Sequence, residues 1–123
     1  MLVVHLIQDV AKIKKSILMY KKLAETINTI TSFQNISEER KATLQQLIDF
    51  VQQKTDNKQE ININFICTHN SRRSHLSQVW AQVAAAHFNL PNVNCYSGGT
   101  EETALFPKVA ETLTEQGFSI FSI

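Results

Sequence analysis

The feature that most constrains the fold is a change of pattern near residue 60, after which apolar runs alternate with helical stretches. Residues 61–66 alternate and then become fully apolar, as in a strand that enters a core, and residues 93–96 and 118–123 are further β-type runs. Between them, residues 76–83 and 107–113 carry apolar side chains at helical spacing. The second half of the chain therefore reads as strand–helix–strand–helix–strand.

This order predicts an α/β fold with right-handed crossovers and an open parallel sheet. A strand order of 2-1-3 places the two crossover helices on opposite faces, which gives three layers. The first strand is then central, and its carboxyl end is where open α/β sheets bind ligands. Cys67 falls at that point. Residues 97–100 are expected to form a turn, and Gly117 is expected to end the last helix.

The first half, residues 1–58, is expected to be a helical extension that precedes a core at residues 59–123. Apolar side chains at three- and four-residue steps between residues 10 and 27 predict one helix. Ser37 is a suitable N-cap for a second helix, and its apolar stripe consists of Leu44, Leu47, Ile48 and Val51. The polar residues 54–58 are expected to form a linker. Residues 1–18 match nothing in the pattern described below, so Met19 is a hypothetical true start.

Composition excludes several classes of protein. The 123 residues carry a net charge of +1, which gives no reason to expect a nucleic acid or an anionic membrane as partner. The apolar residues 1–7 are too few to span a bilayer, and no basic residue precedes them as in a secretory signal. Two cysteines are too few for a disulfide scaffold. A reducing cytoplasm is therefore the expected location.

The loop after residue 66 carries the chemistry. Its backbone N–H groups, together with those of the following helix, are expected to form a nest for an anion. The helix N-terminus and a nearby guanidinium stabilise a thiolate, and an arginine fork can hold two oxygens of a tetrahedral anion. The loop residues are Cys67, Thr68, His69, Asn70, Ser71, Arg72, Arg73 and Ser74.

The spacing Cys-x5-Arg-Ser after a buried strand, with Asn70 at the fourth loop position, resembles the low-molecular-weight protein tyrosine phosphatases. It equally resembles the arsenate reductases that share their fold. The likeness covers residues 61–123 and includes a Ser-x-Gly-Thr turn at residues 97–100. It implies that Cys67 is the nucleophile and forms a cysteinyl-phosphate or cysteinyl-arsenate. It also implies that Arg73 binds the oxyanion, and the residues between them complete the oxyanion-binding loop.

By the same resemblance, Asn70 holds the loop in shape and Ser74 donates a hydrogen bond to the thiolate. The chain departs from the family pattern at His69, where the family commonly has a glycine of unusual backbone conformation, and at Arg72, where a cysteine is common. Either His69 adopts that conformation, at a cost of about 1 kcal/mol, or it lines the rim of the site and favours a negative substrate. The general acid of the family is an aspartate in a loop beyond the third strand, and this sequence ends before that loop.

Glu101 or Glu102 could replace that acid, although acids at such a position are more typical of a helix N-terminus. His69 and His75 flank the loop, but no zinc-like spacing accompanies them, so neither a metal nor another cofactor is expected. Cys95 lies inside a predicted strand and is expected to be a packing residue.

Three functions remain open at this point. The first is a cysteine-dependent phosphomonoesterase that acts on a phosphate-type oxyanion such as phosphotyrosine. The second is an arsenate reductase that uses an external thiol, and the third is an oxyanion-binding module or fragment with little catalysis. Residues 118–123 would leave an apolar strand at the edge of the sheet, which predicts a homodimer that covers this edge.

Overall fold

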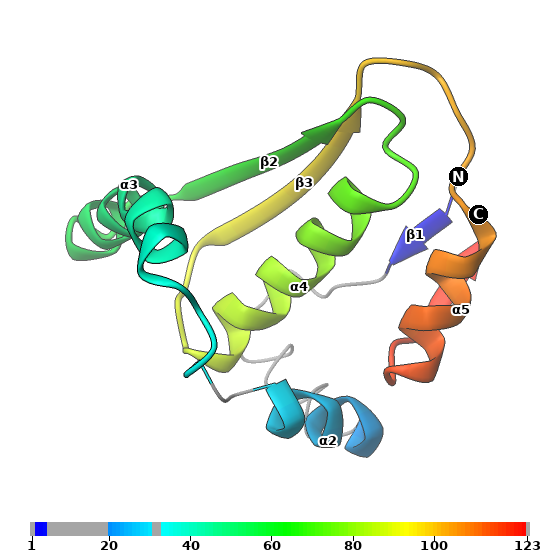
Figure 1. Cartoon of the computed structure of the whole chain (residues 1–123), viewed down its shortest axis with the longest axis horizontal. Helices are drawn as coiled ribbons and strands as arrows, with labels where there is room; N and C mark the ends of the chain where they lie inside the picture. The colour runs from blue at the N-terminus through cyan, green and yellow to red at the C-terminus, as the bar shows by residue number, and fades with distance from the viewer. Residues whose placement is uncertain (1, 5–19, 31–32, 123) are drawn as a thin grey trace.

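The computed structural model describes residues 2–4, 20–30 and 33–122, and its elements alternate between helix and strand in the second half of the chain (Figure 1). The elements are β1 (Leu2–Val4), α2 (Lys21–Ile30), α3 (Glu38–Asp56), β2 (Ile61–Cys67), α4 (Arg73–His87), β3 (Val93–Gly99), α5 (Pro107–Glu115) and β4 (Ile120–Ser122). The predicted α/β class and the helical N-terminal part are confirmed.

Strands β2 and β3 pair in parallel over seven residues, from Ile61 beside Val93 to Cys67 beside Gly99. Because side chains alternate along a strand, every second residue of β2 faces α4, and Ile61 is fully buried there. The pairing continues to Gly99, so residues 97–99 belong to the strand, and the predicted turn at residues 97–100 is wrong in this part. Strand β3 continues to Gly99 because the backbone of β2 pairs with it as far as Cys67.

The outer edge of β3 is closed by side chains of α4. Gln78 donates from Nε2 to the carbonyl of Cys95 at 3.0 Å, and Gln82 donates to the carbonyl of Val93 at 2.8 Å. Gln82 also accepts from the Cys95 N–H at 3.0 Å. These bonds satisfy backbone groups that a further strand would otherwise pair with, because a glutamine amide offers both a donor and an acceptor.

The third predicted strand takes a different partner from the one expected. Strand β4 pairs antiparallel with β1, in the register Leu2 beside Ser122. Of the predicted order 2-1-3, the pairing of the first two predicted strands, now β2 and β3, is found. The third predicted strand, β4, lies outside the β2–β3 sheet. A short strand pairs with whichever unpaired backbone lies beside it, and here that backbone comes from the start of the chain. Strand β1 thus covers part of the strand edge on which the homodimer prediction is based, and the homodimer stays a prediction.

Helix α4 lies between two apolar clusters. On one side, Ile61, Ala85, Val93 and Cys95 form the cluster beneath the sheet. On the other side, the buried cluster joins α4 to α2, α5 and the segment before β4, through Leu23, Ile27, Val79, Val83, Val109, Leu113 and Phe118. Among the described residues the predicted third layer is not found, because α5 packs on the apolar second side of α4 rather than on the opposite face of the sheet. That opposite face keeps Ile66 and Tyr96 64% and 49% exposed.

Gly117 holds α2 against the end of α5. Its φ of +103° lies in the region that favours glycine, and a Cβ there would lie 2.4 Å from the backbone nitrogen of Leu23. Thr26 donates to the carbonyl of Gln116 at 3.0 Å, which fixes the same junction. The predicted end of the last helix at Gly117 is confirmed, since α5 stops two residues before it.

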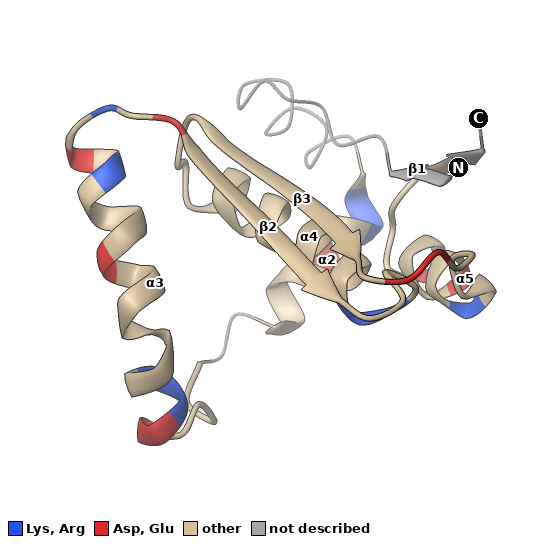
Figure 2. Ribbon diagram, turned by 90° about the horizontal axis from the view of Figure 1, so that it is seen from above, with Lys and Arg blue, Asp and Glu red and all other residues tan. Residues whose placement is uncertain are grey.

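Helix α3 begins as the sequence predicts, but of its predicted apolar stripe Val51 packs against the core cluster beneath the sheet, whereas Leu47 and Ile48 do not reach it. Ser37 accepts a hydrogen bond from the Arg40 N–H at 3.2 Å, so it is the N-cap. Leu47 and Ile48 remain exposed, because α3 contacts β2 near the C-terminal end of the helix and extends away from the sheet (Figure 2). The helix continues to Asp56, so the linker predicted at residues 54–58 is shorter than expected.

Residues 10–19 of the first predicted stripe, including the hypothetical start at Met19, lie outside the described residues. Within α2, Leu23 and Ile27 are buried in the cluster shared with α4. The division at residue 58 stays a prediction. Among the described helices, none combines the length and the apolar character that crossing a membrane requires.

Candidate active site

The predicted loop lies at the carboxyl end of β2 and leads directly into α4, whose first residue is Arg73. It surrounds an open pocket of about 200 Å³, lined by Cys67, His69, Ser71, Arg72, Arg73 and Thr103. Five of the eight predicted loop residues therefore line one pocket. The other three, Thr68, Asn70 and Ser74, form hydrogen bonds that hold the loop, as described below.

The Cys67 sulfur lies 3.1 Å from the hydroxyl oxygen of Ser74. This hydrogen bond is the main reason that the pKa of the Cys67 thiol is lowered to about 7, and the backbone N–H groups of Ser74, Asn70 and Ser71 lower it further. Burial acts in the opposite direction and is outweighed. Near neutral pH, a large share of Cys67 is therefore the nucleophilic thiolate.

Asn70 connects Ser74 to the rest of the loop. Ser74 is only 3% exposed, and its hydroxyl oxygen lies 2.6 Å from Asn70 Oδ1, which accepts the single hydroxyl proton when that proton is not donated to the Cys67 thiolate. Asn70 has a φ of +43°, which asparagine tolerates better than most residues. The unusual backbone conformation expected at His69 is thus found at Asn70, while His69 has no positive φ. The loop accommodates histidine because its strained position lies one residue later.

Replacing Ser74 by alanine is expected to raise the pKa of Cys67 above about 7, because the largest stabiliser of the thiolate is removed. Since only the thiolate reacts, alkylation by iodoacetamide slows about tenfold per unit of pKa at acidic pH and approaches the wild-type rate at alkaline pH. The pH dependence of alkylation measures this shift. An unchanged midpoint in a folded variant would contradict the assigned role of Ser74.

The segment after β3 crosses directly over the loop. The Thr68 carbonyl accepts hydrogen bonds from the N–H groups of Thr100 and Glu101, both at 2.9 Å. This approach requires a glycine: a Cβ on Gly99 would lie 2.9 Å from the Asn70 nitrogen and 3.0 Å from the Thr68 carbonyl oxygen. Both neighbours are backbone atoms, which cannot move aside without changing the loop.

Gly99→Ala is therefore expected to destabilise the fold by about 1–3 kcal/mol, as overpacking does, and to slow Cys67 alkylation at neutral pH. Gly98→Ala is the matched control, because its Cβ would meet side-chain atoms at 3.9 and 4.0 Å, an ordinary contact. Urea unfolding midpoints and alkylation rates of the two variants test this difference. Equal behaviour of both variants would show that the crossing does not hold the loop.

A second contact between the two segments lies at the rim of the pocket. His69 Nδ1 lies 3.4 Å from Glu101 Oε2, and the Thr103 hydroxyl donates to the His69 carbonyl. Figure 2 shows the basic residues of the loop and the acidic residues after β3 at the same end of the sheet.

Helix α5 begins only at Pro107, with no acid in its first turn. Glu101 and Glu102 are therefore not helix N-terminal acids, contrary to the more typical interpretation.

Arg72 is held beside the pocket by an aromatic ring. Its guanidinium lies 5.2 Å from the centre of the Phe106 ring, a cation–π arrangement. The Phe106 N–H also donates to the carbonyl of Ser71 at 3.2 Å. Phe106 thus closes the loop from the side of the segment that leads to α5.

Neither Cys95 nor His75 is among the residues that line the pocket of the reactive sulfur. Burial raises the pKa of the Cys95 thiol to about 11. Cys95 precedes Gly99, the neighbour of Cys67, by four strand residues, or roughly 13 Å, which is beyond the reach of a disulfide.

His75 is half-buried, its pKa is lowered mainly by burial, and its Nδ1 lies 3.3 Å from the Ser97 hydroxyl. No cluster of three potential metal ligands is found among the residues that the structure describes.

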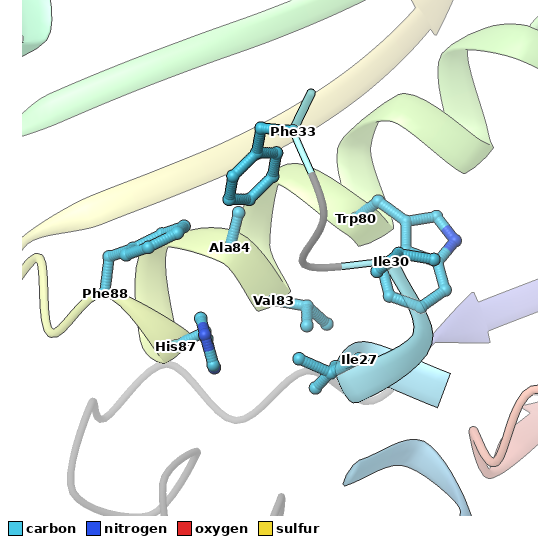
Figure 3. A pocket seen from close by; sticks show the side chains of 8 residues that line it. All are labelled: Ile27, Ile30, Phe33, Trp80, Val83, Ala84, His87 and Phe88. Atoms are coloured by element: carbon cyan, nitrogen blue, oxygen red, sulfur yellow. The ribbon is translucent and has the colours of Figure 1, made fainter. Parts of the chain in front are cut away.

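A separate pocket of about 180 Å³ lies between α2 and α4, and its lining is almost entirely apolar (Figure 3). Aromatic rings border it on the side of Phe33 and Phe88, whose centres are 6.5 Å apart. The remaining lining residues are Ile27, Ile30, Trp80, Val83, Ala84 and His87. It holds no cysteine or arginine, so the oxyanion chemistry belongs to the loop pocket.

A family model described as low molecular weight phosphotyrosine protein phosphatase matches residues 62–123, half of the chain. The chain belongs to this phosphatase family. An arsenate reductase from Staphylococcus aureus is 41% identical to it over 59 residues, which make up 47% of this chain and 41% of the relative. The chain thus spans less than half the length of this curated relative. No solved structure gives a significant match.

In this member of the phosphatase family, sequence reasoning missed three residues of the site. Thr103 and Phe106 lie 29 and 32 positions after Ser74, the last residue of the loop, and no local pattern marks them. Gly99 carried a signal, the Gly98–Gly99 pair, which was interpreted as a turn rather than as a place where two backbones meet.

Proposed function

We propose that the chain is a cysteine-dependent phosphomonoesterase that acts through a phosphorylated Cys67. The observation that carries this proposal is the position of the Cys67 sulfur, which lies 3.1 Å from the Ser74 hydroxyl oxygen in a pocket that it shares with Arg73. The hydrogen bond from Ser74 lowers the pKa of this thiol to about 7. A thiolate at the amino end of a helix, among inward-facing N–H groups, is placed to attack a bound tetrahedral anion. A reducing compartment such as the cytoplasm would keep this thiol free.

The reaction has two steps. The Cys67 thiolate attacks phosphorus, an S–P bond forms, and the P–O bond to the leaving alcohol breaks as that oxygen takes a proton. Water then attacks the phosphocysteine, the S–P bond breaks, and inorganic phosphate and the thiolate are released. Arg73 and the loop N–H groups hold the equatorial oxygens, on which negative charge is carried through both transition states.

An aryl phosphate such as phosphotyrosine is the proposed substrate class. The Phe106 ring is 45% exposed and lies beside the pocket, where Arg72 stacks on it. An aromatic leaving group can pack against this surface while its phosphate occupies the loop. Aryl oxygens are also better leaving groups than alkyl oxygens, so they depend less on a proton donor.

The test is hydrolysis of para-nitrophenyl phosphate, with rapid acid quenching and intact-mass measurement to detect phosphocysteine. Vanadate, which imitates the five-coordinate transition state, is expected to inhibit turnover and to protect Cys67 from iodoacetamide. Protection by phosphate or vanadate without any turnover would instead identify an oxyanion-binding module with little catalysis.

Arsenate reduction is a second candidate, favoured by the likeness to the Staphylococcus aureus arsenate reductase. Cys67 would displace an oxygen of arsenate to form an S–As bond. A low-molecular-weight thiol would then attack the Cys67 sulfur, forming a disulfide and releasing arsenite, so that two thiols are oxidised as As(V) becomes As(III). The distance and high pKa of Cys95 argue that the second thiol is external. Arsenate-dependent consumption of glutathione tests this reaction.

A further inference from the structure

The pair formed by His69 and Glu101 joins two segments at the rim of the reactive pocket. His69 comes from the loop after β2, and Glu101 comes from the segment after β3. Their side chains are 52% and 60% exposed, so the pair faces solvent, and His69 lines the same pocket as Cys67. The hydrogen bond from the Thr103 hydroxyl to the His69 carbonyl fixes the backbone of His69 and so limits the position of its imidazole.

We propose that His69, oriented by Glu101, is the general acid and base of this site. The inference rests on the proposed phosphatase function and adds the proton donor to it. Because Nδ1 contacts the carboxylate, the proton available for transfer is the one on Nε2. A carboxylate that holds one ring nitrogen fixes the tautomer and the orientation of the ring, which is the arrangement that histidine acids and bases use.

The other groups around the pocket are less suited to this task. Arg72 and Arg73 line the same pocket, but a guanidinium serves there as a hydrogen-bond donor to an anion and not as an acid or base. Cys67 is the nucleophile, and His75 is half-buried beside Ser97. Among the described residues, aspartate occurs only at positions 49 and 56, in α3, which joins the opposite end of β2 (Figure 1).

The proton balance closes over the two steps. As Cys67 forms the S–P bond, the His69 imidazolium gives its Nε2 proton to the departing oxygen and becomes neutral. Neutral His69 then takes a proton from the water that attacks the phosphocysteine, which restores the imidazolium as the S–P bond breaks. No further reactant is needed.

The experiment compares two substrates, para-nitrophenyl phosphate and phenyl phosphate, in the full chain and in three variants. The nitrophenolate leaves readily without a proton, whereas the phenolate does not. His69→Gln is expected to lose about 10²–10⁴-fold in kcat on phenyl phosphate and less than about tenfold on para-nitrophenyl phosphate. Glu101→Gln is expected to show the same selectivity with a smaller loss. Glu102→Gln, the same charge change one residue away, is expected to behave as the wild type.

The dependence on the leaving group gives a readout that a structural role would not move. Because His69→Gln lacks the proton donor, its kcat is expected to depend more steeply on the leaving group than that of the wild type. Equal losses on both substrates, or no loss on either, would overturn the role of His69. Wild-type protein that hydrolyses neither ester would overturn the proposed function itself, which separates the two failures.

Discussion

Replacing Cys67 by serine is expected to abolish phosphatase turnover, with a loss on the order of 10⁴-fold or more, while oxyanion binding remains. The serine hydroxyl is not ionised at neutral pH, whereas the Cys67 pKa of about 7 supplies a thiolate. The loop N–H groups and Arg73 are unchanged, so phosphate or vanadate still binds. Steady-state hydrolysis of para-nitrophenyl phosphate and calorimetric titration with vanadate measure the two properties separately.

Cys95→Ala is the control for this experiment, since Cys95 is buried in the cluster beneath the sheet and roughly 13 Å along the strands from the reactive sulfur. It is expected to keep full turnover per folded molecule. Turnover that persists in Cys67→Ser, or that disappears in Cys95→Ala with the fold intact, would contradict the assignment of the nucleophile.

Arg73→Lys is expected to lower kcat/KM by about 10²–10³-fold, although the positive charge is kept. A guanidinium holds two oxygens of the transferring group with a planar fork, and an ammonium contacts them as a point charge. Because Arg73 is the first residue of α4, its backbone position is fixed by the helix that follows. Michaelis–Menten parameters for para-nitrophenyl phosphate provide the measurement.

Arg72→Lys is the matched comparison, with the same substitution one residue earlier. The Arg72 guanidinium stacks on Phe106, so its loss is expected to remain below about tenfold and to fall mainly on KM for aryl substrates. Losses of equal size in the two variants would show that both arginines hold the oxyanion equally.

The site was more accessible to sequence reasoning than the arrangement of the sheet. Cys67, Asn70, Arg73 and Ser74 lie within eight consecutive residues, and a strand before and a helix after fix their relative positions by local geometry. Ser37 was predictable for the same reason, since an N-cap depends on residues within one turn.

Features that depend on distant partners could not be read in this way. The pairing of β4 with β1 joins the two ends of the chain, and a three-residue run does not specify its partner. The stripe containing Leu47 and Ile48 predicts a buried helix face, yet periodicity gives the direction of a face and not the presence of something to cover it. Phe106 and Thr103 reach the pocket because the segment between β3 and α5 passes beside it, and no local pattern specifies that path.

The two cysteines differ in their reactivity toward thiol reagents, so labelling of the unmodified chain can report on the opening of its core. Cys67 reacts in the folded state, whereas Cys95, buried and with a pKa of about 11, becomes reactive only when the sheet separates from α4. A thiol reagent followed by mass spectrometry would therefore record first a single adduct and later a second one. The delay between them reports the free energy of opening of the core, without any introduced probe.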